Sequence, residues 1–355
     1  MGVQDYLYSE FDNEIIEEFL MMIDIMEDNI DLIIEDLYNN YEDNINELFR
    51  MFHNLKSATG FLKLERINKI NPDILKGLEE KKEFSFRINR HKADLEAIEE
   101  LKKEGYNPKK VNWSDYVYTL PIDDRKKVTK SAPYTQNKIY IQNLSSIIAA
   151  NSLDIDENDW VLDLAAAPGG KSLIFSEKAK KVSSVEPDKK RFFRMKRNFK
   201  EHGAKNIQTY NKDGRFVYKA TGEMFDKVFL DAPCSSEAHI ELDKGITWWN
   251  LKRVRRFSKL QKELLISAFE ALKTGGEMIY ATCTFSPEEN EENIDFLLKK
   301  YSNAEILKVD LPIENIQEGI TKWEDKEFNP EVKKAVRILP KDAYSGFFFC
   351  KIRKN

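Results

Sequence analysis

Cysteine is scarce in this sequence, which has only three among its 355 residues. Three thiols cannot all pair within one chain and none has metal-ligand spacing, so we expect neither a disulfide framework nor a bound metal. Long apolar runs are also missing, since no stretch of about 18 apolar residues could span a membrane. The acidic start, MGVQDYLYSEFDNE, lacks the apolar core of a signal peptide. These absences predict a cytoplasmic protein with no membrane partner.

The net charge of −5 conceals an uneven distribution along the chain. Residues 1–85 contain 8 Lys/Arg and 20 Asp/Glu, a net of −12, whereas the other 270 residues contain 48 and 41, a net of +7. A basic body behind an acidic amino-terminal region favours a polyanionic partner that contacts only the body. A small excess over so many residues is also common in proteins that bind no nucleic acid, so charge alone leaves both interpretations open.

The hydrophobic pattern divides the chain into parts. Apolar residues recur at helical spacing within 11–65, and the Asn71-Pro72 pair is suited to a further helix start. From Trp160 onward, strands and helices alternate, which predicts a mostly parallel sheet with helices on both faces. Helices are expected after Gly170 and over 188–201, 258–272 and 287–300. The predicted parts are an all-α helical domain at 1–84, a small α+β region at 85–145 and an α/β domain at 146–355.

Acidic residues follow four successive predicted strands, at Asp163, Glu186, Asp213 and Asp231. The loop 164–172 is rich in small residues, which let a ligand approach the backbone closely. It has neither the G-x-G-x-x-G nor the G-x-x-x-x-G-K spacing, which argues against a dinucleotide or P-loop site. Strand-end acids also cap helices, which explains one or two of them well but four in register less well. The set suits a ligand with ribose hydroxyls, an adenine amine and a positive charge, such as S-adenosylmethionine.

Two of the cysteines lie directly after predicted strands. Cys234 stands in DAPCS after the apolar run KVFL, and Cys283 stands in TCT after MIYA. In an open α/β sheet, ligands bind at the carboxyl ends of the strands, so both thiols are expected to face the cofactor. A free cysteine is more often a small buried hydrophobe, and we assign that role to Cys350 in the apolar segment FFFC.

These motifs together resemble the Sun-type RNA (cytosine-5) methyltransferases over about residues 86–351. The anchors, in chain order, are YIQNLSS (140–146), VLDLAAAPGGKS (161–172), VEPDKKR (185–191), NKDGR (211–215), FLDAPCS (229–235), LQKELL (260–265), LKTGGEMIYATCTFSPEENE (272–291) and RILPKDAYSGFFF (337–349). The resemblance implies a Rossmann-like methyltransferase fold with a mostly parallel seven-stranded sheet that ends in an antiparallel strand. It also implies that the small region before it binds RNA.

The resemblance further implies roles for individual residues. The S-adenosylmethionine site is expected to be lined by Ala165, Ala166, Ala167, Pro168, Gly169, Gly170, Lys171, Glu186, Arg191, Asp213 and Asp231. Cys283 matches the nucleophile that adds to carbon 6 of cytosine, and Cys234 matches the cysteine that assists product release. Asp231 is placed to hydrogen-bond the cytosine ring.

The loop after Cys234 departs from the family pattern. The family usually continues DAPCSG-x-G, whereas here the sequence reads DAPCSSEAH, without either glycine. DNA cytosine-5 methyltransferases are the nearest rival, but they use the Pro-Cys cysteine as nucleophile, and the TCTFSPEENE setting of Cys283 favours RNA. A signalling module with an inactive methyltransferase part is the alternative from another class. The sequence does not distinguish ribosomal RNA from transfer RNA as the substrate.

Basic and aromatic residues alternate between residues 87 and 130, as in many single-stranded RNA sites. The candidates for RNA contact are Arg87, Arg90, Lys92, Lys102, Lys103, Lys109, Lys110, Arg125, Lys126, Lys127 and Lys130, with Trp113, Tyr116 and Tyr118 between them. Each lysine alone is as readily explained as a solvated surface charge.

The segment around His53 resembles the histidine phosphotransfer (HPt) motif. That family presents an exposed histidine on a helical bundle, followed three residues later by lysine and then by small residues, as in His53, Lys56 and Ser57-Ala58. The resemblance implies that His53 accepts a phosphoryl group and that the partner is a response-regulator protein. A non-phosphorylated helical cap is the alternative.

Overall fold

The computed structural model describes residues 21, 64, 66–79, 83–240 and 249–355. It divides into two units, one of residues 1–76 with 240–250 and one of residues 77–239 with 251–355. Helix α4 (Pro72–Glu79) begins where the Asn71-Pro72 pair predicts, with the side chain of Asn71 accepting a bond from the amide of Asp73. His53 and most of the predicted amino-terminal helices lie outside the described residues.

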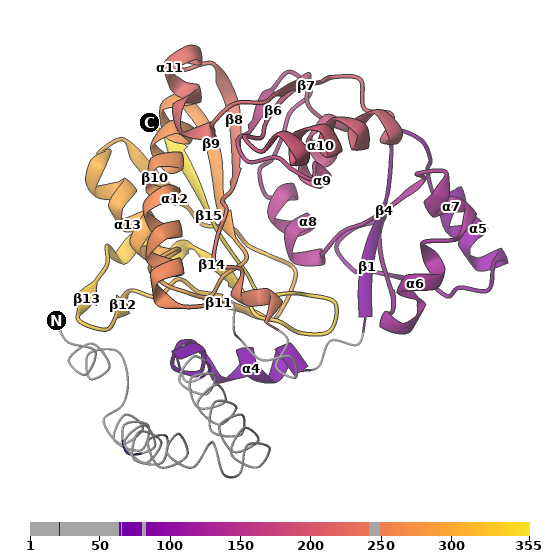
Figure 1. Ribbon diagram of the computed structural model, residues 1–355, viewed down its shortest axis with the longest axis horizontal. Coiled ribbons are helices and arrows are strands. Elements are labelled where there is room, and N and C mark those ends of the chain that lie inside the picture. The colour runs from indigo at the N-terminus through magenta and orange to yellow at the C-terminus, as the bar shows by residue number, and fades with distance from the viewer. Residues whose placement is uncertain (1–20, 22–63, 65, 80–82, 241–248) are drawn as a thin grey trace, which may run out of the picture. The chain divides into compact units, whose positions relative to one another are not determined.

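The large sheet has nine strands in the order β11-β14-β15-β9-β8-β5-β6-β7, with β10 paired to β15 (Figure 1). The parallel strands are β5 (Trp160–Asp163), β6 (Lys181–Val185), β7 (Ile207–Tyr210), β8 (Phe225–Asp231) and β9 (Leu272–Thr282). The antiparallel strands are β10 (Ala304–Leu307), β11 (Ile316–Glu318), β14 (Val336–Ile338) and β15 (Phe347–Lys354). The expected number of seven is therefore wrong, because β11 and β14 have three residues each and are too short to show a strand period.

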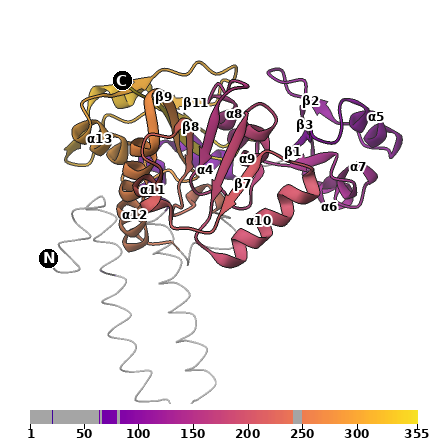
Figure 2. The same ribbon diagram turned by 90° about the horizontal axis from the view of Figure 1, so that it is seen from above.

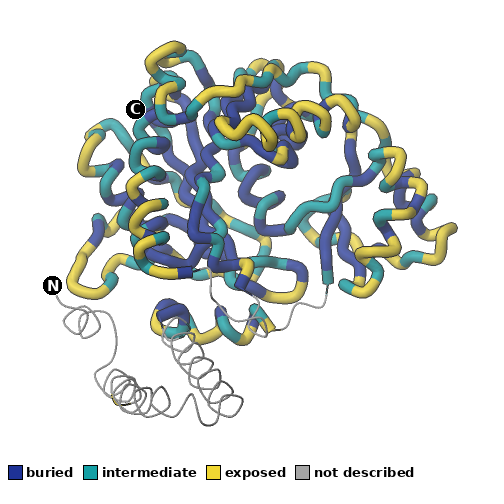
Figure 3. The backbone as a smooth tube through the Cα atoms, in the orientation of Figure 1, coloured by how far each residue is buried: buried dark blue, intermediate teal, exposed yellow. Residues whose placement is uncertain are grey.

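Helices cover both faces of this sheet, as the alternation predicts. Figure 2 shows α12 (Leu251–Ala271) and α13 (Glu291–Lys300) on one side of β8 and β9, with α8 (Leu144–Asn151) on the other side. The central strands are buried on both faces (Figure 3), and Val228, Phe229 and Leu230 of β8 are fully enclosed. Such continuous apolar segments are typical of parallel strands between two helical layers.

Other helices connect the strands. They are α9 (Gly170–Ser176), α10 (Lys189–His202), η2 (Gly214–Phe216), α11 (Val217–Thr221), η3 (Glu237–His239) and η5 (Pro330–Lys334), and a two-stranded hairpin is formed by β12 (Lys322–Trp323) and β13 (Lys326–Glu327). Two predicted helix starts are wrong. Helix α12 begins at Leu251 rather than 258, and α13 begins at Glu291 rather than 287 because residues 287–290 form turns whose side chains point into the protein.

A small antiparallel sheet precedes the large one, in the order β2-β3-β1-β4. Its strands are β1 (Glu83–Ile88), β2 (Lys109–Lys110), β3 (Val117–Pro121) and β4 (Ile139–Ile141), and its helices are α5 (Glu96–Lys103), η1 (Ile122–Asp124), α6 (Arg125–Val128) and α7 (Ala132–Thr135). Phe86, Ile88, Leu101 and Ile139 are buried in its own apolar core. The predicted domain boundaries at 84/85 and 145/146 stay predictions. No helix in the described part of the chain is long and apolar enough to cross a membrane.

Candidate active site

The predicted site residues meet at one edge of the large sheet. Strands β5, β6, β8 and β9 are parallel neighbours, so their carboxyl ends lie side by side. In the pairing register Asp163 lies opposite Ser184 and Phe229, and Asp231 lies opposite Ala281. The loop after β5 and the two cysteine loops after β8 and β9 therefore share this edge.

The loop from Ala165 to Lys171 is held by side chains of α10. Arg191 donates to the carbonyl of Ala167 at 2.9 Å, and Asn198 donates to the carbonyl of Pro168 at 2.9 Å. Gly169 has a left-handed φ of 106°, and a Cβ there would lie 2.5 Å from Cε1 of Phe199. Only glycine fits this position, so the backbone of the loop packs directly against α10.

Two buried carboxyl groups lie beneath this loop. Asp163 accepts a hydrogen bond from Ser172 at 2.6 Å through Oδ2, while its Oδ1 has no hydrogen-bond partner among the described residues. Burial raises the pKa of Asp163 to about 7 and also raises the pKa of Glu186. Arg191 lies 3.4 Å from Glu186, so one arginine links this acid to the loop. Small residues above polar acids fit the predicted S-adenosylmethionine.

Asp213 fits the interpretation of the strand-end acids as helix caps better than the interpretation of them as ligand contacts. Its side chain accepts from the amide of Arg215 at the start of η2 and is paired with the Arg215 guanidinium at 2.7 Å. These hydrogen bonds from Arg215 lower the pKa of Asp213. The carboxylate nevertheless lines a cavity of about 680 Å³ along β5, β6 and β7, whose lining is largely apolar and includes Val185 and Phe216. This cavity offers an apolar surface beside the acid.

Lys171 connects the loop to the end of β8. Its Nζ lies 2.6 Å from Oδ2 of Asp231, and it sits over the rings of Phe229 and Phe347. Burial alone would lower the pKa of Lys171, but the Asp231 carboxylate holds it above its ordinary value. The lysine therefore stays cationic at the junction of the cofactor loop and the cysteines.

The two predicted thiols are brought together, with Sγ of Cys234 3.3 Å from Sγ of Cys283. The first is buried and the second half-buried. Hydrogen bonding from Cys234, supported by one from His239, lowers the pKa of Cys283 although burial opposes this shift. The same contact and burial raise the pKa of Cys234. The pair is therefore arranged with the anionic sulfur on Cys283 and the proton on Cys234.

Two buried acids that the sequence analysis did not select as site residues join the cysteine loops. Glu237 accepts hydrogen bonds from Thr284 Oγ1 and the Phe285 amide at 2.7 Å each and from Ser286 Oγ at 2.5 Å. Glu289 accepts from the Ser235 amide at 3.0 Å, and burial together with Glu237 raises the pKa of Glu289 to about 8. Their positions in the sequence could have identified them, because Glu237 lies in the altered loop after Cys234 and Glu289 lies in the PEENE segment after Cys283.

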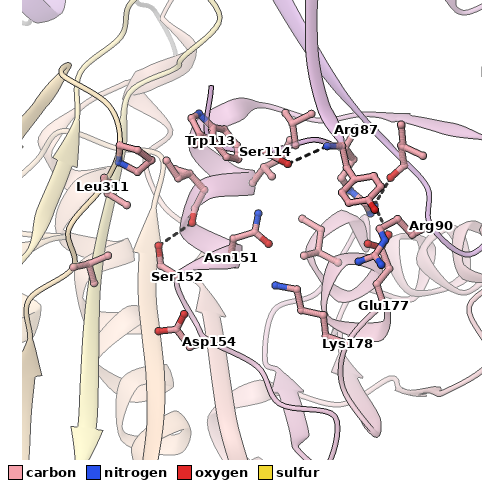
Figure 4. Close-up of a pocket in the computed structure, with 18 of the residues that line it drawn as sticks. Arg87, Arg90, Trp113, Ser114, Asn151, Ser152, Asp154, Glu177, Lys178 and Leu311 are labelled. Atoms are coloured by element: carbon pink, nitrogen blue, oxygen red, sulfur yellow. Dashed lines mark hydrogen bonds and ion pairs between the residues drawn. The ribbon is translucent and has the colours of Figure 1, made fainter. Parts of the chain in front are cut away.

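The residues predicted to contact RNA divide into two groups. Most of the basic ones are exposed, but Arg87 is 3% exposed and pairs with Glu177 at 2.6 Å, and Tyr118 is 7% exposed and stacks on Phe86. These two are wrong as surface contacts, because both faces of this sheet are covered. Tyr118 lies with Phe86 in the core of the small sheet, whereas Arg87 is on the other face and is bonded to Glu177. Figure 4 shows that Arg87 and Glu177 lie in the wall of a cavity of about 600 Å³.

Three of the other residues predicted to contact RNA line that cavity, and their contact with RNA stays a prediction. Arg90 lies over the ring of Tyr116 at 4.7 Å from its centroid, and Trp113 donates to the hydroxyl of Tyr344. Lys178 lines the opposite side (Figure 4). Among the described residues, no group of three or more His, Cys, Asp or Glu could hold a metal ion.

Curated relatives match most of this chain. It is 33% identical over 279 residues to the tRNA (cytosine(49)-C(5))-methyltransferase of Pyrococcus abyssi (strain GE5 / Orsay), covering 76% of this chain and 88% of that protein. It is 31% identical over 282 residues to the ribosomal RNA small subunit methyltransferase F of Aliivibrio fischeri (strain MJ11), covering 76% of this chain. The match spans 58% of that bacterial relative's length.

Solved structures share the fold. The methyltransferase homolog protein from Pyrococcus horikoshii superposes with a TM-score of 0.67 at 28% identity, covering 80% of this chain and 90% of that one. NSun6 from Pyrococcus horikoshii, solved with SFG, gives a TM-score of 0.65 at 22% identity over 80% of this chain and 94% of that one. Residues 150–353 match the family model described as 16S rRNA methyltransferase RsmB/F. The chain therefore belongs to the RsmB/F family of methyltransferases.

Proposed function

We propose that the protein is a cytoplasmic enzyme that converts cytosine in ribosomal or transfer RNA to 5-methylcytosine. As a methyltransferase of the RsmB/F family, it uses S-adenosylmethionine as methyl donor. The observation that carries the RNA proposal is the pair of thiols 3.3 Å apart at the ends of β8 and β9. The names of the curated relatives, which include a transfer RNA and a ribosomal RNA methyltransferase, support the same substrate class.

The residues that would hold the cofactor are those of the loop after β5 and the acids beside it. The small side chains of Ala165 to Gly170 let a ligand approach the backbone of this loop, and the buried Glu186 is suited to accept ribose hydroxyls. Asp213 offers a second acceptor, although its carboxylate is ion-paired with Arg215. When bound, the cofactor supplies an electrophilic methyl group.

Cys283 and Cys234 carry out the covalent chemistry. Carbon 5 of cytosine is a poor nucleophile, and addition of a thiolate to carbon 6 makes carbon 5 enamine-like, which divides one hard step into easier ones. Cys283 is the nucleophile, because it is the thiol whose pKa is lowered and the thiolate is the reactive form. Cys234, which keeps its proton, assists release of the product. Asp231 holds the ring, with Lys171 bound to one of its oxygens.

Cysteine variants test this division of roles. With cytosine-containing RNA and methyl-labelled cofactor, Cys283→Ala is expected to abolish turnover, and Cys234→Ala is expected to accumulate a protein–RNA adduct on a denaturing gel. Cys350→Ala is the matched control, because this thiol is buried inside β15 and is expected to leave turnover unchanged. Full activity of Cys283→Ala would overturn the assignment.

An experiment in cells can identify the RNA substrate. Bisulfite sequencing of ribosomal and transfer RNA from a strain lacking the protein is expected to reveal a cytosine that has lost its methyl group. Complementation with Cys283→Ala should leave that position unmethylated. Unchanged methylation in all ribosomal and transfer RNAs would contradict the proposed substrate class.

The amino-terminal region carries a separate proposal, which rests on sequence alone. His53 with Lys56 three residues later is proposed to exchange a phosphoryl group with a response-regulator partner. Incubation with a phosphorylated response regulator should place an acid-labile phosphate on the protein, and His53→Gln should remove it. Equal labelling of both proteins would refute this role for His53.

A further inference from the structure

His239 lies at the end of the altered loop, directly beside the nucleophile. Helix η3 is joined to the loop of Cys283 by its backbone, because the Ala238 amide donates to the Cys283 carbonyl at 3.1 Å. The turn is closed by the His239 amide, which donates to the Ser236 carbonyl at 3.0 Å. Hydrogen bonding from the Cys234 thiol, and after it from the His239 imidazole, lowers the pKa of Cys283. An imidazole and a thiol in this contact form the base–nucleophile pair found in other enzymes with cysteine nucleophiles.

The neighbouring acid fixes this geometry. Glu237 is 1% exposed and accepts three hydrogen bonds from Thr284, Phe285 and Ser286, the residues that follow the nucleophile. The segments before His239 and after Cys283 are therefore bound to each other at several points. The approach of the ring to the sulfur is set by this network rather than by a free loop.

The other titratable groups that face Cys283 are poor acceptors for its proton. Cys234 keeps its own proton, as its raised pKa indicates, and Lys171 is already cationic. Asp231 is held by Lys171 at 2.6 Å, and its charge opposes ionisation of the thiol. Glu289 accepts from the Ser235 amide and is itself stabilised in the protonated form by burial.

We propose that His239 is a catalytic base that takes the proton of Cys283 and stores it as an imidazolium. The S–H bond breaks, the proton moves to a ring nitrogen of His239, and the electron pair stays on Sγ. That pair then forms the bond from Sγ to carbon 6 of cytosine, while the carbon 5–carbon 6 π pair moves toward carbon 5. The role in turnover rests on the proposed function, whereas the proton transfer is a property of the protein alone.

The reactivity of Cys283 toward iodoacetamide tests the proton transfer without RNA or cofactor. The alkylated peptides of Cys283 and Cys234 are quantified separately by mass spectrometry between pH 5.5 and 9.5. In His239→Gln the Cys283 rate at pH 6.5 is expected to fall about tenfold or more, since one pKa unit changes the thiolate fraction about tenfold below the pKa. The rates of variant and wild type should converge near the alkaline end of the range.

A matched control is available at His91, which is half-buried in the small-sheet region and hydrogen-bonded to Ser176 at 2.7 Å. His91→Gln is expected to keep the wild-type alkylation profile of Cys283. A profile of His239→Gln that overlays the wild type would overturn the proposal. So would a wild-type Cys283 that becomes reactive only above the ordinary thiol pKa of about 8.5.

A second measurement avoids substituting the histidine. The four histidines of the chain can be followed by NMR in the wild type and in Cys283→Ala. Loss of the thiolate is expected to lower the pKa of His239 by one unit or more, about a tenfold change in proton affinity, because the imidazolium loses its anionic partner. An unchanged His239 titration would reject the pairing. Normal pairing without any RNA methylation by the wild type would instead reject the proposed function alone.

Discussion

Removal of the Glu237 carboxylate is expected to loosen both cysteine loops. This side chain lies at the end of β8's loop and reaches three donors in the segment after β9, at 2.5–2.7 Å. All three donors belong to residues that are almost completely buried. In Glu237→Gln one oxygen remains, but the amide NH₂ faces donors, so at least one buried donor loses its acceptor.

The magnitude follows from these contacts. A hydrogen bond to a charged acceptor contributes about 1.5–3 kcal/mol, and a buried donor without a partner costs about 1–3 kcal/mol. The sum over three bonds is an upper limit, because desolvation of the carboxylate already offsets part of the gain. We therefore expect Glu237→Gln to destabilise the protein by about 3 kcal/mol, which corresponds to a Tm lower by roughly 6–12 °C for a domain of this size.

Thermal unfolding followed by circular dichroism measures this effect. Glu99→Gln is the control, because Glu99 accepts a hydrogen bond from Lys102 on the exposed face of α5 and its loss should leave the Tm unchanged. Alkylation of Cys283 by iodoacetamide should also become slower at pH 6.5 and rise more steeply with pH in Glu237→Gln, since the ring of His239 is no longer held and the thiol pKa moves toward its ordinary value. A Tm within 1 °C of the wild type, at the precision of about 0.3 kcal/mol, would refute the argument that this carboxylate joins the loops.

Three further predictions follow from single groups. Ser236 has a left-handed φ of 63°, so Ser236→Gly is expected to raise the Tm by about 2–4 °C, equivalent to about 1 kcal/mol, and a lower Tm would contradict it. Glu289 has a folded pKa of about 8, above its unfolded value of 4.5, so the folded state holds an extra proton and its stabilising effect is lost as pH rises from 4.5 through 8. Denaturant titrations should therefore show a shallower decline of stability over this range in Glu289→Gln than in the wild type. Arg337 is buried against Glu291 with Nη2 2.6 Å from Oε2, so Arg337→Leu should cost about 3–5 kcal/mol in urea titration, whereas joint replacement of both residues should cost less.

The sequence allowed the edge of the sheet to be predicted better than the contacts across it. Strand ends are visible as apolar runs, so Cys234 and Cys283 could be assigned to neighbouring strand ends, and the structure brings them to 3.3 Å. The partners of Glu237 are 47–49 positions away in the sequence. Such a contact depends on how two loops pack, and the hydrophobic periodicity of the sequence does not predict it.

Errors in the fold have a similar origin. Apolar and polar residues alternate along β1, but this pattern does not show that both faces of the strand are covered, and Arg87 is buried on the face opposite Phe86 with Glu177 as its partner. The first turn of α13 was placed too early because Pro287 and the following acids are typical of a helix start. Instead, Asn290 accepts from Thr282 at 2.6 Å and donates to the Thr284 carbonyl at 3.0 Å, which uses this segment to support the cysteine loop.

The lost glycines of the loop after Cys234 have a physical consequence. Ser236 occupies a left-handed conformation that disfavours a side chain by roughly 1–2 kcal/mol, and a glycine there would not be penalised. The strained turn persists because the next residue, Glu237, is fixed by three hydrogen bonds to the opposite loop. A glycine-rich loop without these bonds could move relative to the nucleophile. Here Glu237 binds the turn to the segment after Cys283, so the residues that replace the family's glycines form a turn that is fixed beside the proposed nucleophile.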